Sequence, residues 1–313
     1  MKKAHVLIFL ACVSVWLCSC NKLNIGDIVD ETRRIDESFQ VVEIRDDIDV
    51  SLKHCTANTP AGTIHITTGE NLIDRINATT EVHTEFNGKD TLTFTKLIIS
   101  NDNDYNNLRP HSHAPEMTVY YDSLLKIIFY SNAQNVRTDT LRGYDFLTHF
   151  TAQDTLEWDS LAPNLYLEVE GGSGNFNVLT NCYKLMVKST HGTSNLTIKG
   201  KTSLASTYAD YDCHGIIDCK ELYSHIHYIT TYGTNKVKAQ SYYMLDVKNG
   251  NVGEVHYLWY RTEKEEHVWN DSLHQFDTVF SPVFCPQVIR YNGEYVSNWN
   301  YNNEIPGLVK VLE

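Results

Sequence analysis

Proline is scarce in this chain of 313 residues, which contains seven, and beyond the first twenty residues no apolar run has the length of a membrane helix. Long stretches in which apolar residues recur with the helical period of 3.6 are missing as well. Acidic residues outnumber basic ones by 39 to 26. A chain this acidic is repelled by nucleic acid and by anionic lipid head groups, so we expect no nucleic-acid partner.

Motifs of several catalytic and metal-binding proteins are also absent. The chain has no Gly-x-Ser-x-Gly elbow, which marks one class of hydrolases, and no cysteine pair at zinc-finger spacing. Cys213 and Cys219 could pair across a bend, and buried free thiols are the alternative. We expect no cofactor and no catalytic residue. Beyond the leader and Cys20, the cysteines are odd in number and scattered, so they form no disulfide framework: Cys55, Cys182, Cys213, Cys219 and Cys285.

The first twenty residues have the pattern of an export signal. Lys2 and Lys3 precede an apolar core, and "LCSC" follows it directly. The small residues before Cys20 resemble a bacterial lipobox, which predicts a signal peptide over residues 1–19 and a lipid on Cys20. An ordinary signal peptide with a chance cysteine is the alternative. Loss of the two lysines takes the formal charge from −13 to −15. Residues 20–37 are polar and predict a lipidated tether.

The rest of the chain, residues 38–313, is predicted to be all-β and a single domain. Residues 38–121 contain alternating stretches with Asn-Gly and Thr-Gly turns, an N-terminal β-strand region. Residues 122–260 repeat with a period of about 20 residues. The clearest copies are "LYLEVEGGSGNFNVLTNCYK" and "LMVKSTHGTSNLTIKGKTS", in which Leu165 matches Leu185 and Phe176 matches Leu196.

Each copy contains two short alternating strands around a corner of small residues. Glycines such as Gly172 and Gly192 suit a corner that needs positive φ. The run "EGGSGNF" resembles a phosphate-binding loop, but no helix or lysine follows it as a P-loop requires. Repeated strand pairs predict a parallel β-helix, or β-solenoid, with rungs of about 20 residues. Residues 261–313 are predicted to cap it.

A third copy, residues 226–240, supplies a candidate metal site. Matching it to the others predicts that Ile226 and Tyr228 point inward, which leaves His225 and His227 on the outer face. Two histidines one residue apart on a strand share a face, as a metal pair would. The sequence fixes no third ligand, so a solvated histidine face is the main expectation and a metal site the alternative.

Acidic residues gather in "YADYDCHGIID", which contains Asp210, Asp212, His214 and Asp218. Carboxylate pairs on such a face carry out acid–base chemistry in β-helical polysaccharide lyases and hydrolases. Turns also favour aspartate, so the acids have a structural explanation. An enzyme acting on carbohydrate is therefore an alternative function.

Aromatic residues crowd the last sixty residues. Exposed aromatic side chains stack on sugar rings or form protein-binding hot spots. The favoured interpretation is that they instead cover the open end of the solenoid, which would otherwise pair edge to edge, with ligand binding as the alternative. The candidate ligand-binding aromatics are Trp259, Tyr260, Trp269 and Trp299.

One short pattern recurs more often than composition predicts. Asp followed by Ser or Thr and an aliphatic residue occurs seven times, where chance would give only about one. The triplet resembles the acceptor motif of the general O-glycosylation system of Bacteroidota. A turn aspartate that leads into a strand is the alternative. The candidate glycosylated residues are Thr91, Ser123, Thr140, Thr155, Ser160, Ser272 and Thr278.

The order of these features resembles a known family. A strand with an acidic mid-point (42–52) is followed by "TGENLIDRI", "TLTF", "MTVYYDSLLKIIFYSNAQNV" and glycine-rich copies. This order is similar to the head GIN domain of auto-transporter adhesins, which is widespread in lipoproteins of Bacteroidota. The resemblance covers most of residues 38–260 and departs at residues 146–164 and at the end. It implies a β-helical, often oligomeric surface or periplasmic domain without established catalytic residues.

We therefore expect a non-enzymatic lipoprotein of the bacterial outer membrane, anchored in the bilayer by its lipid. Its solenoid surface would serve adhesion, or binding of a glycan or a surface protein, and homo-oligomers are a further expectation. A carbohydrate-active enzyme and a periplasmic structural protein are the alternatives. Residues 21–24 lack the acidic run that resembles a surface-export signal in these bacteria. That absence slightly favours the periplasmic face.

Overall fold

A computed structural model of the chain describes residues 25–46, 48–86, 91–102, 114–130, 135–141, 165–250, 253–270, 275–296 and 307–312. These residues form twenty β-strands and one short 3₁₀ helix, η1 (Ile73–Arg75). The prediction of an all-β chain is confirmed. No helix in the described part of the chain is long and apolar enough to cross a membrane.

The N-terminal region mixes antiparallel and parallel pairing. β1 and β7 both pair antiparallel with β4, and β5 and β6 form a long hairpin. β2 pairs in parallel with β6, and β3 pairs in parallel with β7. The strands are β1 (Ile28–Arg34), β2 (Val41–Ile44), β3 (Asp49–His54), β4 (Thr63–Gly69), β5 (Ile76–Phe86), β6 (Thr91–Asn101) and β7 (Glu116–Tyr121).

β1 corrects the prediction of a tether over residues 20–37. Its seven residues pair with β4 from Ile28 opposite Gly69 to Arg34 opposite Thr63. The Nε of Arg33 lies 2.6 Å from a carboxylate oxygen of Glu31. Edge strands often have charged residues, because charge prevents pairing with a further strand. Such a strand therefore has the same polar composition as a solvated segment. That is why the sequence pattern concealed this strand.

Two rows of parallel strands follow, which we call ladder A and ladder B. β11 (Asn175–Gly192), β12 (Asn195–Cys213) and β13 (Ile216–Thr231) each contribute their first half to ladder B and their second half to ladder A. Ladder A also contains β6, β2, β8 (Lys126–Tyr130), β10 (Leu165–Glu170), β15 (Met244–Asn249) and β18 (Val288–Tyr291). Ladder B also contains β7, β3, β9 (Asn135–Leu141), β14 (Lys236–Ala239), β16 (Glu254–Asn270) and β20 (Leu308–Leu312).

The register confirms the repeat in its clearest copies. Leu165 pairs with Leu185, and Phe176 pairs with Leu196, each 20 residues further along the chain. At the corner, Gly192 has a φ of 96°. A Cβ on Gly192 would lie 2.6 Å from the carbonyl oxygen of Gly172, so the corner excludes a side chain. The glycines therefore serve as corners, as predicted.

The predicted register of the third copy is wrong by one residue. Thr197 pairs with Asp218, but Lys199 pairs with Glu221, so a bulge adds one residue to β13. Beyond the bulge the buried residue Ala205 pairs with His227, so His227 rather than Ile226 lies in the inward row of ladder A. Tyr228 is 39% exposed, whereas His227 is fully buried. The histidine thus takes the inward position that the sequence pattern assigned to its neighbours.

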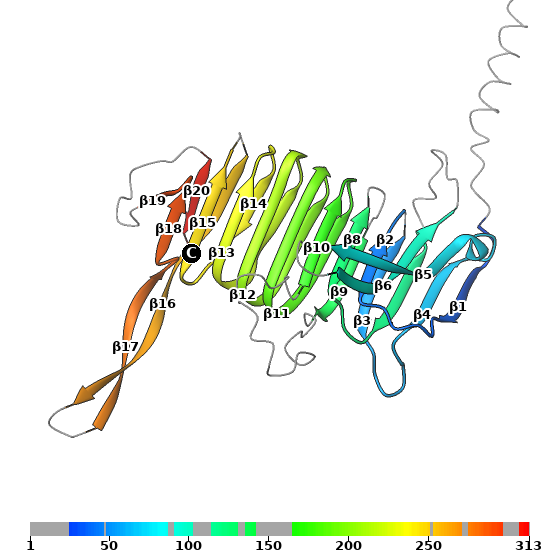
Figure 1. Cartoon of the computed structure of the whole chain (residues 1–313), viewed down its shortest axis with the longest axis horizontal. Helices are drawn as coiled ribbons and strands as arrows, with labels where there is room; N and C mark the ends of the chain where they lie inside the picture. The colour runs from blue at the N-terminus through cyan, green and yellow to red at the C-terminus, as the bar shows by residue number, and fades with distance from the viewer. Residues whose placement is uncertain are drawn as a thin grey trace, which may run out of the picture.

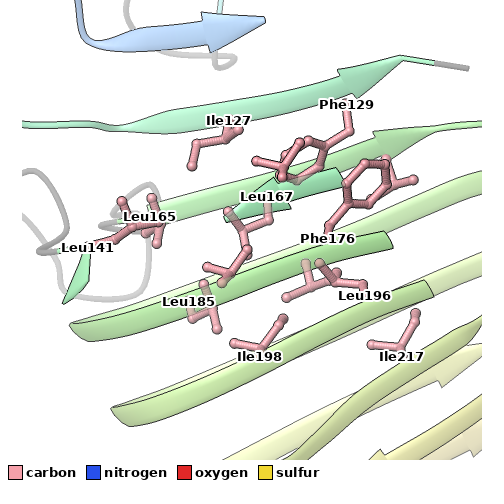
Figure 2. Packing of buried hydrophobic residues seen from close by; sticks show 14 of the residues in the cluster. Ile127, Phe129, Leu141, Leu165, Leu167, Phe176, Leu185, Leu196, Ile198 and Ile217 are labelled. Atoms are coloured by element: carbon pink, nitrogen blue, oxygen red, sulfur yellow. The ribbon is translucent and has the colours of Figure 1, made fainter. Parts of the chain in front are cut away.

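The core lies between the two ladders and is mainly aliphatic and aromatic, with some buried polar residues such as Thr207 and His227. Phe129 of ladder A stacks on Phe176 of ladder B, with 4.3 Å between ring centroids and an angle of 9°. Figure 2 shows this pair among side chains that repeat from one strand to the next, such as Leu165 above Leu185. Each fully buried side chain of this kind contributes about 1.5–3 kcal/mol.

At the C-terminal end, β16 continues beyond ladder B. From Tyr260 to Asn270 it pairs antiparallel with β17 (Gln275–Cys285). Figure 1 shows this hairpin, which we call the arm, projecting from the end of the array that lies furthest from β1. β19 (Glu294–Val296) pairs antiparallel with β18. The described part of the predicted capping region thus extends the ladders and adds the arm.

Candidate functional site

The two candidate metal ligands do not share a face. His227 lies inside ladder A between Ala205 and Leu245, and its Nε2 lies 2.9 Å from Oγ1 of Thr207. Burial lowers the pKa of His227 to about 4, so the ring is neutral near pH 7. His225 is exposed, and its ring stacks on Tyr243 with 5.4 Å between centroids. The prediction of an outward pair is wrong.

A metal site finds no support elsewhere in the part of the chain that the structure describes. No group of three or more His, Cys, Asp or Glu residues there is arranged to hold a metal ion. The five cysteines that follow the leader are all free, and four of them are buried. Burial raises the pKa of the Cys219 thiol to about 12, so it is an inert core residue rather than a nucleophile.

The acidic cluster is divided between the two ladders. Asp218 lies in the ladder B half of β13, where Nζ of Lys238 lies 2.8 Å from its carboxylate. Asp210 and Asp212 lie at the end of the ladder A half of β12. Nδ1 of His214 lies 2.6 Å from Oγ1 of Thr234. Since Asp218 is neutralised by its own lysine, this arrangement gives no support to a catalytic carboxylate pair.

Three tyrosines beside Asp210 form an aromatic cluster, which we call the tyrosine corner. Tyr211 stacks on Tyr232 with 5.0 Å between ring centroids and an angle of 22°. Tyr208 meets Tyr232 edge-on at 6.0 Å. Nζ of Lys248, on the next strand of ladder A, lies 6.0 Å from the ring centroid of Tyr232. The ring of Tyr211 is 61% exposed, so the cluster opens to solvent.

The backbone holds this cluster in place. The amide of Tyr232 donates to the carbonyl of Ala209 at 2.9 Å, which fixes the two chain segments side by side. A Cβ on Gly250 would lie 2.5 Å from Cδ1 of Tyr232, so only glycine lets that ring lie flat against the next strand. Asp210 accepts a hydrogen bond from the amide of Tyr211 at 2.8 Å. The rings therefore sit on a rigid support.

The cluster also affects the ionisation of its members. Burial, followed by the charge of Asp210 and the nearby hydroxyl groups, raises the pKa of Tyr208 above its ordinary value, and the charge of Lys188 opposes this. The phenol consequently stays protonated over the whole physiological range. It can donate a hydrogen bond as well as accept one.

The C-terminal aromatics mainly join the arm to ladder B. Trp259 is half-buried and stacks on Phe284 with 4.6 Å between centroids. Nζ of Lys310 lies 3.8 Å from the centroid of Trp259. Burial raises the pKa of the neighbouring Tyr260 to about 12. Trp299 lies outside the described residues, and of Trp269 only the backbone is described.

The arm exposes apolar side chains as well as charges. Phe280 is 60% exposed, and Val268, on the opposite strand, is 50% exposed. The register places Phe280 opposite Glu265. Val268 lies opposite Asp277, an odd number of residues from Phe280, so the two apolar side chains point to opposite faces of the arm. Unlike the tyrosine corner, the arm rests on no second layer in Figure 1.

The candidate modification sites differ in their surroundings. Thr91 and Thr278 are exposed on strands, and Ser123 is half-buried. Asp139, which precedes Thr140, accepts a hydrogen bond from Oη of Tyr121 at 2.6 Å, so it has a structural role. Of Thr140 only the backbone is described. Cys20, Thr155, Ser160 and Ser272 lie outside the described residues.

Buried ion pairs on the outer side of ladder A escaped the sequence analysis. The carboxylate of Glu168, a residue only 5% exposed, lies 2.5 Å from Nζ of Lys188 and 2.9 Å from Nζ of Lys126. Burial raises the pKa of Glu168, but hydrogen bonds from the two lysines outweigh it and hold the pKa below its usual value. Glu168 and Lys188 lie 20 residues apart, so the interval that pairs Leu165 with Leu185 also pairs them. Lys126 belongs to β8, outside the two clearest copies of the repeat, and its place beside Glu168 could not be derived from them.

Residues 38–258 match a family model described as "Putative auto-transporter adhesin, head GIN domain". No curated protein matches the chain in sequence. The matched segment begins after β1 and ends just before the arm. It includes the tyrosine corner and nearly all of both ladders.

Several solved structures resemble the chain. A putative adhesin from Bacteroides fragilis NCTC 9343 is 15% identical, with a TM-score of 0.50, over 74% of this chain and 88% of that one. A putative adhesin from Parabacteroides merdae ATCC 43184 is 17% identical, with a TM-score of 0.45, over 74% and 89%. A putative lipid binding protein from Parabacteroides distasonis ATCC 8503 is 14% identical, with a TM-score of 0.46, over 91% and 97%. At these identities the first likeness shows the fold alone.

Proposed function

Because the chain belongs to the head GIN domain family of putative auto-transporter adhesins, we propose that it is a non-enzymatic lipoprotein of the outer membrane that binds a partner through its exposed surface. The two ladders would form a β-solenoid that holds this surface rigid. The observation that carries the proposal is the arm, which presents apolar side chains at the end of the array furthest from β1.

The regular register of the middle strands supports the proposed solenoid. From β10 to β16, neighbouring strands of ladders A and B pair in parallel at separations near 20 residues, and their inward side chains share one core. Each strand is buried against its neighbours above and below, so the array resists bending. A rigid array transmits the position of its anchored end to its free end. Such a scaffold suits a protein that must present a surface away from the membrane.

The geometry sets the distance between anchor and arm. If the lipid is on Cys20, the eight residues up to Ile28 can span at most about 28 Å. Ladder A and the adjoining β19 comprise ten successive strands, beginning at β6. At about 4.8 Å between strands, that row is about 40 Å long. The end with β1 would therefore face the bilayer, and the arm would point away from it.

The composition of the arm fits a contact surface. A two-stranded hairpin with no second layer is at best marginally stable in water. Exposed Phe280 and Val268 add an unfavourable hydration free energy that a partner would remove. Glu263 and Glu265 on the same strand keep the unbound arm soluble. Both features are expected of a surface that alternates between free and bound states.

Anchoring is tested by replacing Cys20 with serine. Without the thiol there is no acceptor for the lipid, so we expect the protein to move from the membrane fraction to the soluble fraction and to lose labelling by a palmitate analogue. Cys55→Ser is the matched control, since that cysteine lies in the folded part of the chain. Retention of C20S in the membrane fraction would contradict the anchor.

Surface exposure and binding are tested together on intact cells. Protease treatment of whole cells is expected to remove the protein. A variant in which Asn-Gly replaces residues 263–282 joins Thr262 to Val283 through a two-residue turn and deletes most of the arm. It should keep the unfolding temperature of the ladders while cells carrying it adhere about tenfold less. Protection from protease until the envelope is opened would overturn an adhesive role and favour a periplasmic structural one.

A further inference from the structure

The tyrosine corner contains a stack of flat groups that ends in solvent. The ring of Tyr232 lies close to the backbone at Gly250, and Tyr211 stacks on Tyr232 with 5.0 Å between ring centroids. Tyr211 itself is 61% exposed, the largest exposure of any tyrosine in strands β10 to β15. The stack is thus supported from below and has an accessible aromatic ring at its outer end. A further flat apolar group could extend it.

Polar groups adjoin Tyr211 in the chain, and Tyr208 interacts electrostatically with both Asp210 and Tyr211. Asp210 and Asp212 flank Tyr211 in the chain. Each of these carboxylates can accept several hydrogen bonds. Tyr208 supplies a phenol that stays protonated. Both donors and acceptors therefore lie within a few residues of the exposed ring. A ligand here must have an apolar face and a rim of hydroxyl groups.

The size of the cluster favours a small ring over a protein. A stable protein interface buries about 800 Å² on each partner. Three tyrosines, two of them partly covered by Gly250 and by one another, provide only a fraction of that area. A hexopyranose has one apolar C–H face of the size of a phenol ring and hydroxyl groups around its edge. It matches both the stack and its rim.

Charge selects among carbohydrates. The two aspartates beside Tyr211 are negative, Lys248 lies 6.0 Å from the ring of Tyr232, and Lys188 interacts with Tyr208. The chain as a whole has a formal charge of −13. Uronic-acid and sulfated polymers would be repelled. Neutral hexose polymers suffer no such repulsion, and aspartate is a good acceptor for their hydroxyl groups.

We propose that the tyrosine corner is a carbohydrate-binding site in which a neutral hexopyranose unit stacks on the exposed face of Tyr211. This inference rests on the proposed function of the chain as a binding protein and assigns it a ligand class and a site. Tyr211 provides the stacking face, and Tyr232 and Gly250 hold it in place. Asp210, Asp212 and Tyr208 orient the hydroxyl groups of the sugar. The arm takes no part in this site.

The test uses the mature full-length chain and three neutral polysaccharides: α-mannan, dextran and laminarin. Affinity electrophoresis measures retardation in gels that contain each polymer, and alginate serves as the acidic comparison. We expect retardation by at least one neutral polymer and none by alginate. Tyr211→Ala should weaken binding about tenfold, because the stacking face is lost, whereas Tyr211→Phe should retain most of the affinity.

Tyr183→Ala is the matched control, because Tyr183 is 60% exposed but lies at the opposite end of the ladder A strands. We expect this variant to bind as the unaltered protein does. Equal binding by Y211A, an equal loss in Y183A, or no retardation by any of the three polymers would overturn the proposal. Adhesion that depends on the arm would survive each of those outcomes, so failure of the sugar site is distinguishable from failure of the proposed function.

Discussion

Gly200→Ala is expected to lower the free energy of unfolding by about 3 kcal/mol, the largest loss from adding one methyl group in the described part of ladder B. Gly200 has a φ of 115°, a conformation that disfavours any side chain. In addition, a Cβ there would lie 1.9 Å from the carbonyl oxygen of Thr180, its partner on the neighbouring strand. Backbone must move, because no flexible side chain is available to give way. Urea denaturation followed by circular dichroism measures the loss.

Gly293→Ala is the control that separates the two causes. Gly293 has a φ of 89°, yet nothing lies within 4 Å of the position of its Cβ. This variant therefore has only the conformational penalty, about 1 kcal/mol. A difference of about 2 kcal/mol between the two variants would measure the steric contact with Thr180. Equal losses would show that the backbone of ladder B yields to the added methyl group and that the register is softer than its geometry indicates.

The parts of this fold that could be predicted from the sequence are those in which the pattern of apolar residues repeats at a constant interval. Leu165, Leu185, Phe176 and Leu196 occur at one interval, and the structure pairs them at that interval. The register of parallel strands could be derived from them because each inward position demands the same chemistry in every copy. A single bulge is enough to make a register derived in this way wrong. After Lys199 the pairing separation grows by one residue, and nothing in the composition of β13 announces it.

Features that depend on irregular parts of the repeat were beyond prediction. Glu168 and Lys188 pair at the 20-residue interval, but Lys126 joins them from β8, outside the two clearest copies. The tyrosine corner depends on Tyr211, near the end of β12, and Tyr232, directly after β13, where the spacing between copies is irregular. The sequence pattern indicated the adjoining aspartates as candidates but not the rings. Trp259 and Tyr260 were candidates for ligand binding, with covering of the solenoid end as the favoured interpretation, and both are half-buried at the base of the arm.

His227 is expected to make the protein sensitive to acid between pH 6.5 and pH 4. Burial lowers its pKa to about 4 in the folded chain, against an ordinary value of 6.5 for a solvated histidine. The folded protein therefore binds the proton more weakly than the unfolded chain does. Stability is complete above pH 6.5 and falls as the pH drops toward 4, by about 3 kcal/mol in total. Urea denaturation at intervals from pH 7.5 to pH 4 measures this loss.

The variant His227→Leu should flatten that part of the stability profile. Leucine suits the position, since Leu185 and Leu245 occupy the same row of ladder A. It removes the His227 ring that lies 2.9 Å from the Thr207 hydroxyl and leaves that hydroxyl with its hydrogen bond to the Cys219 thiol, so H227L alone should be less stable at pH 7 by about 1 kcal/mol. Adding Thr207→Val removes the incompletely satisfied hydroxyl and should recover most of that loss.

His225→Leu is the comparison that makes the result specific. His225 is exposed and precedes the buried ring by two residues, so its removal should leave the acid-induced loss of stability unchanged. If H227L and H225L gave the same pH profile as the unaltered protein, the acid sensitivity would arise elsewhere. If only the stability profile of H227L were flat between pH 6.5 and pH 4, one inward-facing histidine in an otherwise apolar row would account for the acid sensitivity. That outcome would also establish by experiment the one-residue shift of β13, because an outward-facing His227 would titrate normally and contribute nothing.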